Sequence, residues 1–167
     1  MTTDRGELTH SAQADREIVI SRVINAPREL VFEAFTGVQH LSQWWGPAGF
    51  TTTTSAFEFR VGGEWVFVMH GPDGTDYQEW ISWTEILPPE RIALLHGESE
   101  DDPNAFESVL TFEAQGTATR IVMRTVFPTK ELCDQAVEKY HAVEGGQQTL
   151  SSLADYVMKL IQAGGKN

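Results

Sequence analysis

The side chains that could carry acid–base chemistry are spread along the chain and form no compact motif. His70, Asp76, Tyr77 and His96 fall in the middle of the sequence, and inside a cavity they could donate and accept protons. The same residue types are also typical of solvated strand ends. We therefore predict no catalytic residue from the sequence, and the acid–base interpretation stays open.

The histidines do not predict a metal site. They stand at positions 10, 40, 70, 96 and 141, and on a possible helix His141 and Glu144 have the i,i+3 spacing of ligands, but two ligands without a second pair are weak evidence for a metal. The chain also lacks a Gly-x-Ser-x-Gly elbow, a phosphate-binding glycine loop and a dinucleotide-binding fingerprint. We expect neither a metal nor a cofactor.

Two adjacent tryptophans stand in the stretch QHLSQWWGPAGF. Leu41, Trp44 and Trp45 have i, i+3 and i+4 spacing, which places them on one side of a short helix. Gly46 can cap that helix in the left-handed conformation, and Pro47 prevents its continuation. We expect this helix end to close one end of a hydrophobic interior, where Trp44 and Trp45 contact either protein alone or a ligand as well.

Residues 50–127 read as a series of strands separated by turn signals, including Gly62-Gly63, which suits a tight hairpin. Alternation within each strand gives inward-facing sets that are large and mostly aromatic. In a regular strand Trp80 and Trp83 face opposite ways, and we expect Trp83 to face inward. The candidate ligand-lining residues from these strands are Phe57, Phe59, Trp65, Phe67, Met69, Trp83 and Met123.

Helices are expected on both sides of this series. A strand from Arg16 leads into a helix that ends at Gly37, and residues 142–161 have an apolar face at helical spacing. Near the start of this last helix, Gly145 and Gly146 lower helix stability, so we expect something to approach the backbone closely there. Glu144 and Gln148, one turn apart, could offer polar groups to a ligand.

The order of elements predicts an α+β fold. One strand, two short helices, further antiparallel strands and a long final helix make a curved antiparallel sheet of about six to seven strands around the C-terminal helix. We expect residues 1–15 to form a flexible N-terminal tail and residues 16–163 to form a single domain. One helix cannot fill all the space beneath such a sheet, so a cavity is expected.

The charge and hydrophobicity of the chain limit which partners and which cellular location we expect. The net charge of −12 repels phosphate backbones and anionic membranes, so nucleic acid and membrane insertion are not expected. No apolar stretch is long enough to span a membrane and the N-terminus lacks the order of a signal peptide, which predicts a cytoplasmic location. The single Cys133 is interpreted as a small buried hydrophobic side chain. The oligomeric state stays open, a homodimer included.

Five motifs follow one another between Asn25 and Val157: NAPRELVFEAFT, WWGP, FEFRVGGEWVFVMHGPDG, ILPPERI and AVEGGQQTLSSLADYV. In this order the chain resembles the activator of heat-shock-protein-90 ATPase homologue family, within the START and polyketide-cyclase-like (SRPBCC) superfamily of helix-grip folds. The resemblance implies a groove between the long helix and the sheet that binds small apolar or amphipathic molecules. A minority of the superfamily are cyclases, hydrolases or dehydratases.

Three functions follow from the residues and the resemblance together. The first is binding of a small apolar or amphipathic molecule in the cavity between the sheet and the C-terminal helix. The second is a cyclase- or dehydratase-like enzyme that uses the same cavity. The third is a chaperone-related protein-interaction module, although co-chaperone activity in the family belongs to members with an additional N-terminal domain, and only about fifteen residues precede the first expected strand here.

Overall fold

The computed structural model of the chain describes residues 15–165, so residues 1–14 of the predicted tail lie outside the described part. One curved antiparallel sheet contains seven strands in the order β1-β7-β6-β5-β4-β3-β2. The elements in chain order are β1 (Glu17–Ile24), α2 (Arg28–Glu33), α3 (Val38–Trp44), β2 (Thr51–Phe57), β3 (Glu64–His70), β4 (Asp76–Leu87), β5 (Arg91–Gly97), β6 (Phe106–Gln115), β7 (Ala118–Val126), α4 (Lys130–Glu138) and α5 (Ala142–Gly165).

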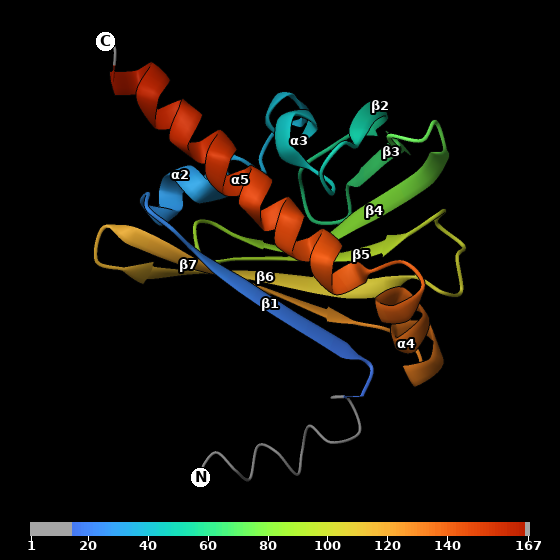
Figure 1. Ribbon diagram of the computed structural model, residues 1–167. Helices are drawn as coiled ribbons and strands as arrows, with labels where there is room; N and C mark the ends of the chain where they lie inside the picture. The colour runs from blue at the N-terminus through green and yellow to red at the C-terminus, as the bar shows by residue number, and fades with distance from the viewer. Residues whose placement is uncertain (1–14, 166–167) are drawn as a thin grey trace, which may run out of the picture.

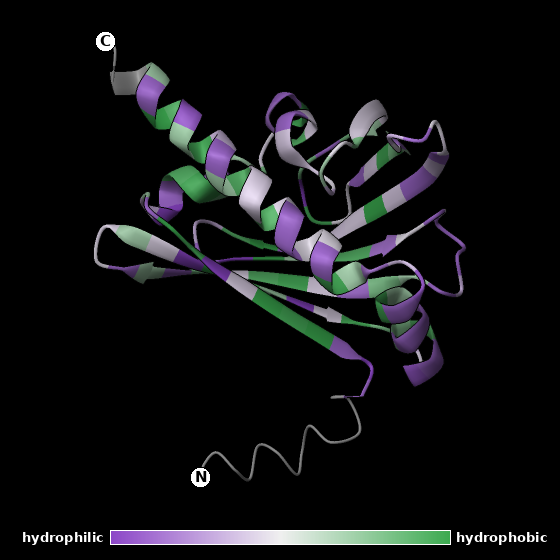
Figure 2. Cartoon of the chain, viewed as in Figure 1, coloured by the Kyte–Doolittle hydropathy of each residue, from purple (hydrophilic) through white to green (hydrophobic). Residues whose placement is uncertain are grey.

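The predicted helix-grip fold is confirmed. The long helix α5 runs diagonally across one face of the sheet, with α4 at its N-terminal end and α2 and α3 on the same side (Figure 1). The apolar side of α5 is turned toward the strands, and Leu150, Leu153 and Val157 on that side are buried (Figure 2). This burial, more than helix propensity, holds α5 in place.

The first strand lies at one edge of the sheet, where β1 pairs with β7 and sets Ile20 opposite Met123. Ile20 and Ile24 are buried, whereas Val19 and Val23 on the other face are exposed. The period-two alternation of this strand therefore places its isoleucines beneath α5.

The helix α2 is shorter than the sequence predicts, because it ends at Glu33 and not near Gly37. The amides of Ala34, Phe35 and Thr36 bond to carbonyls three residues earlier, with N···O distances of 3.3, 3.0 and 3.0 Å. Such bonds tighten the backbone into a final turn and end the α-helix. This turn buries Ala34 and Phe35 completely.

The predicted two-residue hairpin at Gly62-Gly63 is wrong. Residues 58–63 form a longer loop between β2 and β3, in which the amide of Gly62 donates to the carbonyl of Trp83 at 2.8 Å. A side chain at Gly63 would stand 2.3 Å from the carbonyl oxygen of Glu58, so only glycine fits there. The glycines thus bring the loop against β4, and Phe59 lies in the loop and not on a strand.

A side-chain cap and a short turn set where the two C-terminal helices begin. The Oγ1 of Thr129 accepts a hydrogen bond of 3.1 Å from the amide of Leu132, which caps the first turn of α4. A short turn through His141, whose φ of 54° lies in the left-handed region, then leads into α5. This turn places the start of α5 over one end of the sheet (Figure 1).

Candidate functional site

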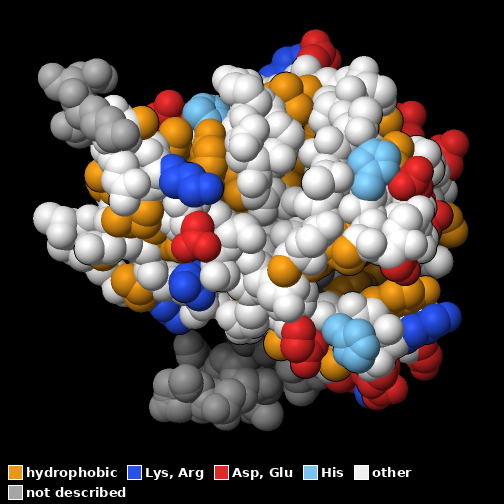
Figure 3. Space-filling view, turned by 45° about the horizontal axis from the view of Figure 1, so that its top comes forward, with side chains coloured by type: hydrophobic (Ala, Val, Ile, Leu, Met, Phe, Trp, Pro, Cys, Tyr) orange, Lys and Arg blue, Asp and Glu red, His pale blue; other side chains and the backbone are white. Residues whose placement is uncertain are grey.

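A cavity of about 280 Å³ lies beneath the N-terminal half of α5. Its walls come from β1, β5, β6 and β7, from the end of α3 with the following turn, and from α5 itself. Figure 3 shows a hollow on one face of the molecule with hydrophobic side chains inside it. The lining residues are Ile18, Ile20, Phe35, Trp44, Trp45, Gly46, Pro47, Met69, Leu94, His96, Phe106, Ser108, Leu110, Met123, Thr125, Phe127, Tyr140, His141, Ala142, Gly145, Gly146, Thr149 and Leu150.

The two adjacent tryptophans both line the cavity but are held differently. Trp44 is 3% exposed, its indole N–H donates to the carbonyl of Ala34 at 3.0 Å, and its ring meets the edge of Phe35 at 4.8 Å between centroids. Trp45 is only partly buried and packs against the ring of Trp65 at 5.1 Å. Trp44 is therefore fixed by the protein core, whereas Trp45 is left partly exposed.

The paired glycines of α5 line the cavity where the helix passes over β1. A Cβ at Gly146 would stand 2.4 Å from Cδ1 of Ile20, and one at Gly145 would stand 3.4 Å from Cγ of Pro47. The close approach to the helix backbone that the glycines predict is therefore present, and the side chain of Ile20 is the group that approaches. Any larger residue at 146 would push into the space between helix and sheet.

Most of the polar groups along the cavity wall are already paired. Ser108 Oγ and Thr125 Oγ1 lie 3.1 Å apart on neighbouring strands and hydrogen-bond to each other. Thr149 Oγ1 donates to the carbonyl of Gly145 at 2.9 Å within α5. These hydroxyls therefore present mainly their carbon atoms to the cavity.

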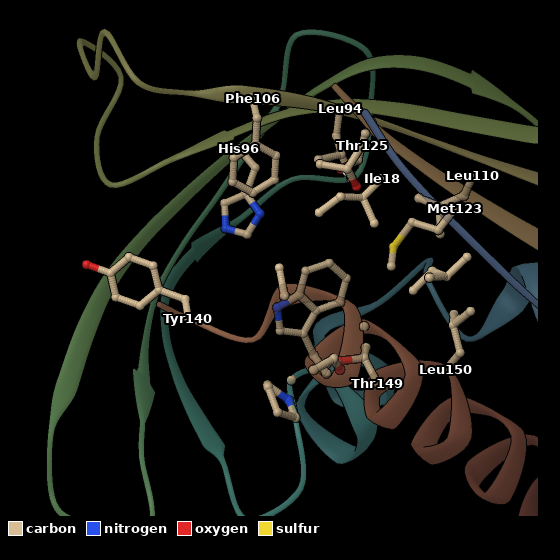
Figure 4. A pocket seen from close by; sticks show the side chains of 18 of the residues that line it. Ile18, Leu94, His96, Phe106, Leu110, Met123, Thr125, Tyr140, Thr149 and Leu150 are labelled. Carbon is tan, nitrogen blue, oxygen red and sulfur yellow. Dashed lines mark hydrogen bonds between the residues drawn. The ribbon is translucent and has the colours of Figure 1, made fainter. Parts of the chain in front are cut away.

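One titratable pair stands at the cavity wall. Nε2 of His96 lies 2.6 Å from Oε1 of Glu79, and the two side chains are 15% and 19% exposed. The ring of Phe106 lies against the imidazole, 4.8 Å away between centroids. Figure 4 shows the imidazole of His96 beside Phe106 and pointing into the cavity.

Four of the twelve predicted ligand-lining residues line this cavity: Trp44, Trp45, Met69 and Met123. The others lie outside it. They are Leu41, Phe57, Phe59, Trp65, Phe67, Trp83, Glu144 and Gln148.

The aromatic residues among these eight fill the other half of the sheet. Trp65 and Phe67 stack at 3.7 Å between centroids, and the edge of Phe59 meets Trp83 at 5.0 Å. Helix α2 adds Phe32, which packs against Phe59 and so closes this half. The aromatic set faces inward as predicted, but its rings pack against one another as part of the core and do not line the cavity.

The two polar residues predicted on α5 point elsewhere. Glu144 is exposed to solvent. Gln148 accepts a hydrogen bond of 3.1 Å from the amide of Ala48, which ties α5 to the turn that follows α3. Gln148 thus holds the cavity wall together from outside.

Several cavity residues were not singled out from the sequence, notably Leu94, Ser108, Leu110 and Thr125, and His96 was named only for possible acid–base chemistry. They come from β5, β6 and β7, and their alternation was readable: Leu94 with His96, and Ser108 with Leu110, are two apart and share a face. The alternation does not show at which end of the sheet the inward-facing side chains leave a cavity.

Tyr140 and His141 also line the cavity, whereas several other titratable groups lie away from it. His70 Nδ1 meets Asp76 Oδ1 at 2.7 Å in an exposed pair. Tyr156 bonds to His40 Nδ1 at 2.6 Å, and burial, followed by the charge of Glu33, raises the pKa of its hydroxyl. Burial also raises the pKa of the Cys133 thiol. Within residues 15–165 no group of histidine, cysteine and acidic side chains is arranged to hold a metal ion.

The model of the Activator of Hsp90 ATPase homolog 1-like protein family matches residues 25–158. The chain belongs to this family. No protein with a curated description is similar enough to count as a match. The family membership agrees with the resemblance found from the motifs.

Solved structures share the fold at low identity. A protein from Nitrosomonas europaea is 20% identical, with a TM-score of 0.80 over 90% of this chain and 98% of its own. One from Arthrobacter aurescens is 22% identical, with a TM-score of 0.79 over 87% of this chain and 88% of its own. An AHSA1 protein from Silicibacter pomeroyi is 21% identical, with a TM-score of 0.70 over 85% of this chain and 97% of its own.

Among the described helices, none has the length and apolar character needed to cross a membrane.

Proposed function

We propose that the chain binds one small apolar or amphipathic molecule in the cavity between the sheet and α5. The observation that carries the proposal is the cavity itself, about 280 Å³ in volume and walled mainly by apolar side chains. Cavities of this kind bind ligands by hydrophobic burial, with a few polar groups fixing orientation. The glycines of α5 support the proposal because they keep side chains out of this space.

Native mass spectrometry of the protein purified from cells tests the proposal. We expect a mass increase from a retained molecule, which solvent extraction then identifies. Thr149→Phe places a ring in the cavity and should empty it, whereas Met158→Phe, on an exposed position of the same helix, should leave occupancy unchanged. Protein that is always empty, and that no lipid, sterol or aromatic compound fills, would contradict the proposal.

An enzyme of the cyclase or dehydratase type is the second candidate. It is favoured by one observation, the 2.6 Å pair of His96 and Glu79 at the cavity wall, because a carboxylate-supported imidazole is a common general base. Chemical conversion of the extracted molecule on incubation with fresh protein would support this candidate over simple binding. The chaperone-related alternative rests on the family name alone.

Three further statements stay predictions. The protein is expected in the cytoplasm, and it is expected neither to bind nucleic acid nor to insert into membranes. Its oligomeric state stays open, and a homodimer is one possibility. The excess of 24 acidic over 12 basic residues supports the exclusion of anionic partners.

A further inference from the structure

We infer that His96 and Glu79 select a ligand that carries a neutral hydroxyl group, such as a phenol or an alcohol, over both its hydrocarbon analogue and its carboxylate analogue. The inference rests on the proposed function, and it names the chemical class of molecule that the cavity takes. It starts from His96, a polar side chain in the mainly apolar cavity wall, which hydrogen-bonds to the carboxylate of Glu79.

The carboxylate of Glu79 fixes the hydrogen of the imidazole. A carboxylate can only accept a hydrogen bond, so Nε2 of His96, 2.6 Å from Oε1 of Glu79, carries the hydrogen. In the neutral ring Nδ1 then keeps a lone pair and acts as an acceptor. Glu79 therefore acts as a positioning residue for the tautomer of His96.

The position of the ring makes that acceptor available to a ligand. His96 lines the cavity, and among the described residues nothing bonds to its Nδ1. Figure 4 shows one ring nitrogen of His96 on the side that faces Ile18 and Thr125 across the cavity. The hydroxyls of Ser108 and Thr125 are engaged with each other, so they do not compete for Nδ1.

The apolar surroundings of His96 Nδ1 make this acceptor favour ligands that donate a hydrogen bond. An acceptor beside the apolar rings of Phe106 and Trp45 loses its hydration when an apolar ligand fills the cavity, unless the ligand returns a hydrogen bond. A hydroxyl returns that bond and a hydrocarbon does not. A carboxylate brings a negative charge close to Glu79, on a chain whose net charge is already −12, and is disfavoured.

Three two-ring probes of nearly one shape separate these cases: naphthalene, 2-naphthol and 2-naphthoate. The phenolic hydroxyl of 2-naphthol is neutral at pH 7. Isothermal titration calorimetry with the full-length protein should show 2-naphthol binding about tenfold more tightly than naphthalene, the usual size of one net hydrogen bond. The carboxylate 2-naphthoate should bind most weakly.

Variants of His96 and Glu79 test whether these two residues cause the preference for 2-naphthol over naphthalene. His96→Leu should abolish the preference, so that 2-naphthol and naphthalene bind with equal affinity, because no acceptor is left to lose its hydration. Glu79→Gln should reduce the preference by a smaller factor, because the amide no longer fixes one tautomer. His70→Leu and Asp76→Asn are matched controls, since they break an imidazole–carboxylate pair of similar geometry, 2.7 Å, outside the cavity, and should bind as the wild type does.

The outcomes separate this inference from the proposed function. Equal affinity for naphthalene and 2-naphthol, or a preference that survives His96→Leu, overturns the inference while the binding function stands. Tightest binding of 2-naphthoate also overturns it, because His96 would then act as a charged donor. Failure of all three probes, together with protein that is always empty by native mass spectrometry, overturns the binding function, and the inference falls with it. If circular dichroism shows that His96→Leu is unfolded, the preference ratio of Glu79→Gln decides.

Discussion

At the scale of single residues, the two adjacent tryptophans have separate roles. Trp44 is buried, hydrogen-bonded to Ala34 and set against Phe35, so it belongs to the core that supports the cavity wall. Trp45 is partly exposed and is held by ring contacts alone, to Trp44, Trp65, Phe67 and His96. The tryptophan at position 44 therefore stabilises the core, and the tryptophan at position 45 forms part of the cavity wall.

This difference gives a testable prediction. Trp44→Ala should lower the free energy of unfolding by about 3–5 kcal/mol, the range for large buried side chains. Trp45→Ala should lower it by less and should weaken binding of 2-naphthol. Urea unfolding and calorimetric titration of both variants measure the two effects. If Trp45→Ala binds the probe as the wild type does, Trp45 contacts only protein.

At the scale of elements, the paired glycines decide how closely α5 can approach β1. Gly145→Ala should raise the free energy of unfolding by about 0.5–1 kcal/mol, because alanine favours the helix and its Cβ would meet Pro47 at an ordinary 3.4 Å. Gly146→Ala should lose this gain, because its Cβ would stand 2.4 Å from the buried Ile20. Urea unfolding compares the two variants, and equal stabilisation of both would contradict the close approach.

The order of helices and strands was predictable from the sequence because its signals are local. Alternation marks the strands, and helical spacing marks α3 and α5. The error at Gly37 arose because a tighter final turn replaces the last turn of the α-helix. The error at Gly62-Gly63 arose where tertiary contacts override local preference, because the amide of Gly62 donates to the carbonyl of Trp83 at 2.8 Å and the amide of Trp83 donates to the carbonyl of Gly63 at 3.1 Å.

The place of the cavity was only partly predictable, since inward-facing residues do not reveal which of them leave space between them. Phe59 packs against Trp83 and is met by Phe32 from α2, a contact that spans 27 residues of chain from Phe32 to Phe59. Gln148 has helical spacing to Glu144, yet its partner is an amide 100 residues away, at Ala48. Such pairings depend on how the elements assemble.

At the scale of the whole molecule, the sheet is divided between two tasks. On one side of the sheet the rings of β2, β3 and β4 pack against one another, and the part under the start of α5 encloses the cavity. The packed rings on one side give the curved sheet the stability that an unfilled cavity under α5 removes. Both parts sit inside a surface that carries a net charge of −12.

That charge predicts how stability depends on salt. The described ion pairs are largely exposed, as Arg60 with Glu58 shows, and exposed pairs contribute little. Repulsion among the excess carboxylates should therefore dominate, and salt should relieve it. Raising ionic strength from about 0.01 to 0.1 M shortens the screening length from about 30 to 10 Å.

We expect the unfolding midpoint to rise by about 2–4 °C over this range, which corresponds to about 1 kcal/mol for a chain of this size. Differential scanning calorimetry in NaCl and in KCl checks the rise, because screening depends on ionic strength and not on the cation. An uncharged solute at equal osmolarity is the control. A midpoint that falls with salt would show that attraction within ion pairs outweighs the repulsion, and that the acidic surface stabilises the fold.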